Sequence, residues 1–229
     1  MSSPITAKKK GALDEALIAA HRKLSHSRRI ELLAGRVADI VRAQEAGGQT
    51  VRCLDVGCGD MQLAERVAEL APASAWSCID IHVLPGELRD AERWRKYRTF
   101  DGRNIPFPDK SFDVVLFCDV LHHVREGAQA LLAEAARAGR VVVIKDHFEY
   151  SLFSRMMLWG MDFLGNWGYG VALPDRYFTQ AGFAEMAAKA GLRVKHLEAG
   201  IDLYAHLPVV RSLLRPKWQF IAVLEPAGR

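Results

Sequence analysis

Two glycines and an acidic residue lie at the junction between two elements expected from the sequence. Residues 54–60 read LDVGCGD, between an apolar run and an amphipathic one. Gly57 and Gly59 let the backbone bend sharply there and approach a ligand with no side chain in the way. A dinucleotide-binding fingerprint needs a third glycine at position 62, which is Gln62. Asp55 would repel a phosphate and instead favours a ligand with an ammonium group.

Two further carboxylates follow at the ends of later apolar runs. Asp80 lies 25 residues after Asp55, and a carboxylate in that place can accept both hydroxyls of a ribose lying across the strand ends. Asp101, in the FDG of residues 100–102, can accept a hydrogen bond from an adenine amino group. These residues predict a site for a ligand with a ribose but no phosphate.

Three histidines could serve as proton acceptors. His122, His123 and His147 lie at or just past the ends of the fourth and fifth apolar runs, and an imidazole near its free pKa of about 6.5 suits a general base. We take His147 and His123 as the candidate catalytic bases. The alternative for His122 and His123 is capping or cofactor contact, and Asp146 is equally a simple hydrogen-bond partner. No metal site is expected, because adjacent histidines point in different directions and no carboxylate spacing supports one.

The elements that position these residues alternate from residue 51 onward. Strands are expected at residues 51–56, 75–81, 97–100, 112–117, 140–145, 193–199 and 218–224, and helices at about 61–70, 86–95, 126–137 and 179–190. This alternation is typical of βαβ units in a mainly parallel sheet with helices on both faces.

The first fifty residues hold all of the net charge of +4, so a nucleic-acid partner is not implied by charge alone. Residues 1–10 are expected to form a disordered basic tail. Residues 11–48 should form two helices, broken near residues 25–27 and stopped at Gly47. Residues 11–229 are then one domain, a length that a single core can support.

Four cysteines at irregular spacings, without a C-x-x-C pair, argue against a zinc ribbon or a disulfide framework. The N-terminal segment lacks the apolar run of a signal peptide. Residues 156–174 are apolar but interrupted by Asp162 and four glycines, so they do not form a membrane span. These features predict a cytoplasmic protein with reduced thiols.

The blocks LDVGCGD, the strand end at Asp80, FDGRNIPFPDKSFDVVLFCDVLHHV and GRVVVIKDHF occur in this order. They resemble the class I S-adenosylmethionine-dependent methyltransferases of the small-molecule, type 11-like kind, over about residues 27–224. The resemblance implies an α/β fold: a Rossmann-like seven-stranded, mainly parallel sheet with a final antiparallel strand, helices on both faces and an N-terminal helical extension. It implies S-adenosylmethionine (SAM) as cofactor and S-adenosylhomocysteine as product.

The resemblance also assigns cofactor-binding positions. It places Gly57, Cys58 and Gly59 against the methionine and ribose, Asp55 as organiser of that loop, Asp80 with Ile81 at the ribose, Asp101 and Gly102 beside the adenine, and Cys118 with Asp119 at the methionine end. A departure is Asp60-Met61, where relatives often have a further small residue. The Asn/Asp-Pro-Pro-aromatic block of base methyltransferases and the glutamate pair of arginine methyltransferases are both missing, which favours a small-molecule or lipid acceptor.

Residues 148–178 are too apolar and too long for a simple connection. They are expected either to form a lid over a hydrophobic acceptor or to pack as a helix into the core or a dimer face, so the protein is a monomer or homodimer. The predicted function is methyl transfer to an O, N or C nucleophile of a small, apolar molecule. The alternatives are a SAM-binding, non-methylating protein of cyclase-like or regulatory kind, a nicotinamide-dependent oxidoreductase, which Gln62 and Asp55 disfavour, and a nucleic-acid-binding module.

Overall fold

The computed structural model describes residues 27–83, 92–124, 126–165 and 173–228. The expected basic tail, the first N-terminal helix and most of the helix expected at 86–95 lie outside these residues. Of that last helix, residues Glu92–Lys96 are described and form a 3-10 helix, η3.

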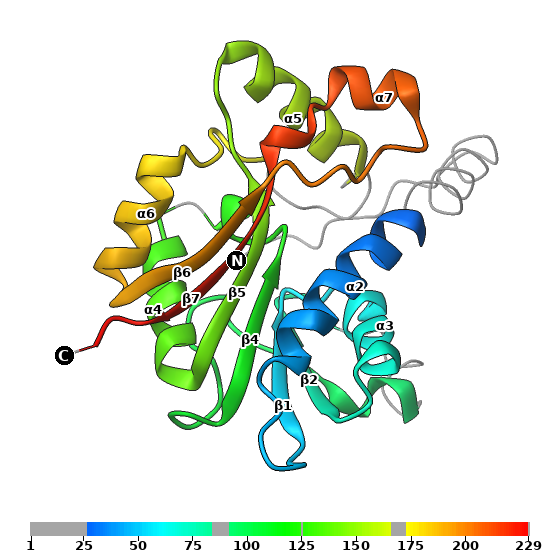
Figure 1. The fold of residues 1–229 in the computed structure, drawn as a ribbon. Coiled ribbons are helices and arrows are strands. Elements are labelled where there is room, and N and C mark those ends of the chain that lie inside the picture. The colour runs from blue at the N-terminus through cyan, green and yellow to red at the C-terminus, as the bar shows by residue number, and fades with distance from the viewer. Residues whose placement is uncertain (1–26, 84–91, 125, 166–172, 229) are drawn as a thin grey trace.

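The seven expected strands are all present, and they form one sheet (Figure 1). They are β1 (Val51–Val56), β2 (Ser74–Asp80), β3 (Tyr97–Thr99), β4 (Phe112–Cys118), β5 (Gly139–His147), β6 (Leu192–Ala199) and β7 (Gln219–Pro226). Their order is β3-β2-β1-β4-β5-β7-β6. The strands β1 to β5 pair in parallel, whereas β7 runs antiparallel to both β5 and β6. This confirms the predicted Rossmann-like fold class.

Helices cover both faces of the sheet. The helices of the described residues are α2 (Ser27–Arg42), α3 (Gln62–Leu70), α4 (Ala128–Ala138), α5 (Leu152–Gly165), α6 (Gln180–Lys189) and α7 (Pro208–Leu213), with short 3-10 turns η4 (Leu121–His123) and η5 (Pro216–Trp218). Helices α5 and α7 lie beyond the ends of the strands (Figure 1). The pair α2 and α3 packs on one face, and α4 and α6 pack on the other (Figure 1). No helix among these described residues is long and apolar enough to cross a membrane.

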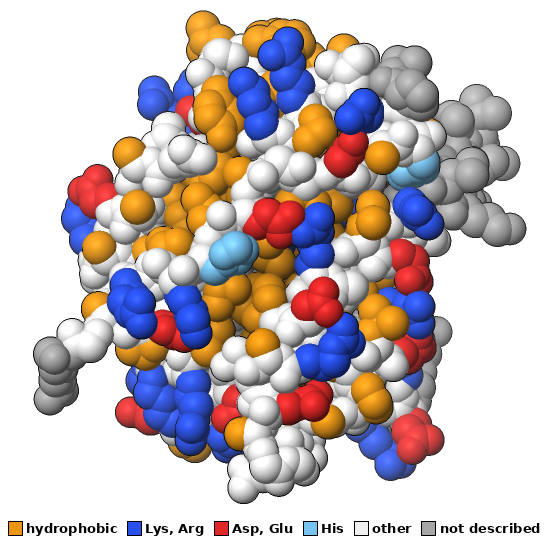
Figure 2. All heavy atoms as spheres, in the orientation of Figure 1, with side chains coloured by type: hydrophobic (Ala, Val, Ile, Leu, Met, Phe, Trp, Pro, Cys, Tyr) orange, Lys and Arg blue, Asp and Glu red, His pale blue; other side chains and the backbone are white. Residues whose placement is uncertain are grey.

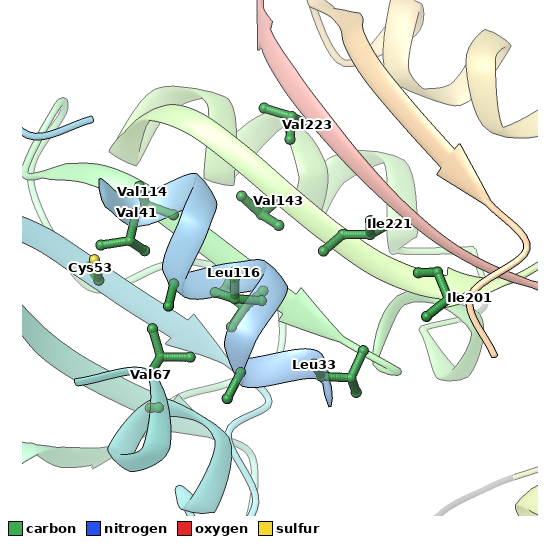
Figure 3. Packing of buried hydrophobic residues seen from close by; sticks show 14 of the residues in the cluster. Leu33, Val41, Cys53, Val67, Val114, Leu116, Val143, Ile201, Ile221 and Val223 are labelled. Atoms are coloured by element: carbon green, nitrogen blue, oxygen red, sulfur yellow. The ribbon is translucent and has the colours of Figure 1, made fainter. Parts of the chain in front are cut away.

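The central strands read as continuous apolar runs because both of their faces are buried. Along β4, Val114 and Leu116 belong to one core cluster, while Val115 and Phe117 belong to the other. Figure 3 shows the first cluster, in which α2 lays Leu33 and Val41 over the sheet. The period-two alternation of strand side chains therefore builds two cores from one sheet.

Two segments differ from their expected form. Strand β5 continues to His147, two residues beyond its expected end, because β7 pairs alongside it as far as the His147–Gln219 register. Residues 148–178 contain the helix α5, which buries Leu158 and Ser154 but leaves Leu152 and Met156 about two-thirds exposed. One side of α5 is thus packed into the core, as the helical alternative expected.

Candidate functional site

The loop after β1 has the sharp turn that its glycines predict. Gly57 adopts φ +75° and Gly59 φ +52°, a left-handed conformation that glycine takes without penalty. A Cβ built on Gly57 would lie 2.5 Å from Val120 Cγ2, whereas one built on Gly59 would meet nothing within 4 Å. Met61 is also left-handed, at φ +64°, and fully buried. The loop is therefore packed tightly against Val120 at Gly57, whereas there is free space beside Gly59.

Two acidic residues lie beneath this loop, at the ends of β1 and β2. Asp80 Oδ2 accepts a hydrogen bond from the Gly59 N–H at 2.8 Å, and Oδ1 accepts one from the His82 N–H at 3.1 Å. Asp55 is 2% exposed. Burial first, and then the nearby Asp80 carboxylate, raise the pKa of Asp55 to about 7. A cationic ligand would therefore relieve a buried, like-charged pair.

The predicted adenine side has an apolar surface beside a glycine. Ile81 is 59% exposed, and a Cβ on Gly102 would come within 3.0 Å of its Cγ2. Asp101 accepts hydrogen bonds from the backbone N–H groups of Arg103 and Asn104 and from the Asn104 amide, at 2.6–2.8 Å. These bonds, led by those from Asn104, lower the pKa of Asp101 to about 2. Asp101 organises this loop, while Ile81 offers a face to a flat ring.

Asp119 joins the ends of β4 and β5 to helix α2. Asp119 adopts φ +55° and accepts hydrogen bonds from the Lys145 ammonium and from the Arg29 guanidinium. Lys145 is 1% exposed, and burial first, then the Arg29 charge, lower its pKa to about 7. Burial also raises the pKa of the neighbouring Cys118 thiol. The predicted methionine end of the site is therefore a buried cluster of charges.

His122 stands between two carboxylates. Its Nδ1 lies 2.6 Å from Asp146 Oδ1, and its Nε2 lies 3.3 Å from Asp162 Oδ2, which also accepts a hydrogen bond from the Tyr177 hydroxyl. The His122 side chain is fully buried. Burial by itself lowers the pKa of His122, but the charges of Asp146 and then Asp162 outweigh it and raise the pKa to about 9. His122 is therefore an imidazolium at neutral pH.

The two predicted bases flank this imidazolium. The rings of His123 and His122 are 4.0 Å apart, and those of His147 and His122 are 5.4 Å apart, between centroids. Burial first, and then the Lys145 charge, lower the pKa of His147 to about 3, so this ring is neutral. Two buried atoms, Asp146 Oδ2 and His147 Nδ1, make no hydrogen bond within the described residues. Such atoms require a water or a ligand group.

The structure unites residues that the sequence indicated with residues that it did not. Sequence reasoning did not single out Lys145, Asp162 or Tyr177. The signal for Asp162 was present: it is the one charged residue of the apolar run 156–165, and a lone buried carboxylate there needs a partner. Lys145 directly precedes Asp146, and its burial could have been inferred from its place in the predicted fifth strand.

Comparisons with known proteins agree with this geometry. Residues 54–141 match the methyltransferase domain family. No curated protein sequence matches the chain.

Solved structures resemble the chain over most of its length. A chain from the complex between the Haloferax volcanii Trm112 methyltransferase activator and a methyltransferase is 14% identical, with a TM-score of 0.62 over 96% of this chain and 100% of that chain. A SAM-dependent methyltransferase from Mesorhizobium loti is 16% identical, with a TM-score of 0.57 over 82% and 96%. The [4+2]-cyclase SpnF is 19% identical, with a TM-score of 0.54 over 84% and 81%. At these identities the three likenesses establish the fold alone.

Proposed function

We propose that the chain, which matches the methyltransferase domain family over residues 54–141 and has a Rossmann-like fold, is a SAM-dependent methyltransferase that methylates an O, N or C nucleophile of a small, apolar molecule. The observation that carries this proposal is the joining of two half-sites at one sheet edge. The glycine loop with Asp55 and Asp80 forms one half. The buried cluster around His122 forms the other.

The first half-site fits the cofactor. Asp80 would hold the ribose hydroxyls, Ile81 and Gly102 would lie against the adenine, and the open backbone at Gly59 leaves room for the chain of the ligand. Asp55, with its pKa raised to about 7 without ligand, would be held ionised by a ligand with ammonium and sulfonium groups. SAM supplies a methyl group that is already electrophilic, so the protein has to align the acceptor and remove its proton.

The second half-site can receive the acceptor. His122, through its own charge, keeps Asp162 ionised although burial alone would raise the pKa of this carboxyl. Asp162 can therefore accept a hydrogen bond from an acceptor O–H or N–H group. Burial and the Asp162 charge raise the pKa of Tyr177 far above its usual value, so its hydroxyl stays protonated and donates. These two groups would orient the reacting atom.

Proton removal is assigned to the two flanking rings. His122 already holds its proton and cannot accept a second one, whereas His147 is neutral and has an orphaned Nδ1. The low pKa of His147 makes this ring a weak base, so it can take a proton only from a strongly acidic acceptor group, because proton transfer is efficient when the two pKa values are close. His123, whose ring lies 4.0 Å from that of His122, is the other candidate base.

Label transfer tests this proposal. Methyl-labelled SAM is incubated with a panel of phenols, medium-chain alcohols, amines and fatty acids, and label in the organic phase is counted. We expect transfer to at least one class and a loss of about 100-fold in kcat for the variant of the true base, His147→Gln or His123→Gln. The exposed His196→Gln on β6 is the matched control. Label transfer that neither variant affects would contradict the assignment.

A non-methylating role on the same fold is the second candidate, and the likeness to the cyclase SpnF is compatible with it. In that case SAM binds with the expected affinity but no acceptor in the panel receives label. Consumption of an acceptor without S-adenosylhomocysteine formation would then identify a reaction of another class. The two candidates therefore differ in a single measured product.

A further inference from the structure

Helix α5 exposes a continuous apolar stripe. Five of its apolar residues are between 38% and 72% exposed: Leu152, Phe153, Met156, Trp159 and Phe163. At 100° per residue these positions fall on one side of the helix. The rings of Trp159 and Phe163 stack at 5.8 Å. Isolated exposed apolar residues are normal on a protein surface, but a contiguous stripe of large ones marks an interaction surface.

The other side of α5 is held firmly by the core and the site. Ser154 is fully buried and its Oγ accepts hydrogen bonds from the backbone N–H groups of Tyr150 and Ser151, each at 2.8 Å. Leu158 is 1% exposed, and Asp162 contacts His122. These contacts fix the rotation of α5 about its axis. The five apolar residues of the stripe therefore face outward and do not belong to the core. One face of α5 serves the site while the other faces outward.

Basic residues flank the stripe. The Lys217 ammonium lies 5.0 Å from the centre of the Tyr150 ring, and the ring of Phe153 lies 6.1 Å from that of Trp218. The adjoining hollow, about 410 Å³ in volume, is lined by Arg211 and Arg215. Figure 2 shows hydrophobic and basic side chains gathered over α5 and α7.

Two of these cations are not neutralised. Arg215 and Lys217 make no ion pair with any described residue, whereas Arg211 pairs with Asp202 at 2.6 Å. An exposed apolar helix face with basic residues along its border is the pattern of a helix that lies in a membrane interface. Its aromatic and aliphatic side chains enter the acyl boundary while the cations meet lipid phosphates.

We propose that the α5 stripe, with Arg215 and Lys217, docks the protein on an anionic phospholipid surface. A second copy of the chain fits less well, because a two-fold contact through this patch would bring its basic border against an identical basic border. Resting on the proposed function, the inference also narrows the acceptor class. Because α5 carries Asp162 on its inner side, the surface docks next to the acceptor half-site, and the acceptor is a membrane-dissolved lipid.

Vesicle co-sedimentation without SAM tests the docking. The probes are phosphatidylcholine vesicles with and without about 30% phosphatidylglycerol, which gives the vesicles a negative surface potential. We expect the wild type to sediment with the anionic vesicles and to be released by salt. The double variant Met156→Ser/Trp159→Ser should bind about tenfold more weakly, and Arg215→Ala/Lys217→Ala should lose most of the preference for anionic lipid.

The control is Val194→Ser/Leu197→Ser, which removes two apolar side chains from β6 that are 36% and 37% exposed, somewhat less than Met156 and Trp159. It should bind vesicles as the wild type does, and all variants should keep their melting temperature, because no buried side chain is changed. Light scattering is recorded in parallel. Three results would overturn the proposal: no vesicle binding by the wild type, equal binding by the α5 variant, or a dimer that only the α5 variant disrupts. A protein that binds vesicles but transfers no label would leave the docking intact and refute the methylation proposal instead.

Discussion

The glycine loop allows one substitution whose effect can be worked out from the structure. Gly57→Ala would place a Cβ 2.5 Å from Val120 Cγ2, in a residue with φ +75°. The left-handed backbone costs about 1–2 kcal/mol for a non-glycine residue. The overpacked contact adds about 1–3 kcal/mol. Because Val120 can yield slightly, we expect a combined loss of about 2–3 kcal/mol.

This loss must appear in one of two measurements. If the loop keeps its conformation, the strain lowers the free energy of unfolding. If the loop moves, the strain is relieved but the cofactor site is distorted, and the Kd for SAM rises by about 30- to 150-fold. Chemical denaturation and calorimetric titration of the same samples would measure both quantities.

Gly59→Ala is the matched control, because it has φ +52° but no heavy atom within 4 Å of its Cβ. In denaturation without ligand it should lose only the backbone part of the free energy of unfolding, about 1–2 kcal/mol. Adding Val120→Ala to Gly57→Ala should return the double variant to the level of Gly59→Ala, once the effect of Val120→Ala alone is subtracted. Wild-type stability together with wild-type affinity in Gly57→Ala would refute the described loop geometry.

Three further predictions concern charge and packing. Since the pKa of Asp55 is raised to about 7, its burial costs stability as the pH rises from about 4 to about 7. In urea denaturation, Asp55→Asn should therefore gain stability relative to the wild type through that window. A difference that stays constant with pH would contradict the raised pKa. The pKa of His122 is about 9 in the folded state and about 6.5 in the unfolded state, so its contribution to stability is complete below about pH 6.5 and is lost by about pH 9. The stability difference between wild type and His122→Asn should therefore shrink across this range. A difference that widens would contradict the raised pKa. Phe220 is fully buried and stacked on Phe148 at 3.9 Å, so Phe220→Ala should lower the free energy of unfolding by about 3–5 kcal/mol, and a loss below about 1 kcal/mol would mean that the core is packed differently.

Local sequence patterns were sufficient for the sheet and for placing the proposed cofactor residues along one edge of it. The strands are continuous apolar runs because both their faces are buried, and the glycine turn of residues 57–59 follows directly from the backbone that such a turn requires. The residues expected near the cofactor lie at or just past the ends of β1, β2, β3 and β4. Parallel strands bring those ends to one edge, so Asp55 and Asp80 meet without any further information.

The acceptor half-site depends on long-range packing that no local pattern reports. Asp162 lies 40 residues after His122, and only the rotation of α5 about its axis brings the two together. The pairing of β7 with β5 extends that strand to His147, which buries a ring expected just past the strand end. Burial together with neighbouring charges then moves the pKa values of His122 and His147 in opposite directions. The sequence shows His122, His123 and His147 but does not show which of these three side chains is charged.

Calorimetric titration of the protein with SAM and with S-adenosylhomocysteine tests the central claim most directly. Wild-type protein should bind both ligands with Kd values of about 1–100 μM, equivalent to roughly −8 to −5.5 kcal/mol. Asp80→Ala should abolish this binding, because it removes the carboxylate that anchors the Gly59 N–H and would hold the ribose. The exposed Asp109→Ala should bind as the wild type does. Absence of binding by the folded wild type, or unchanged binding by Asp80→Ala, would contradict the account.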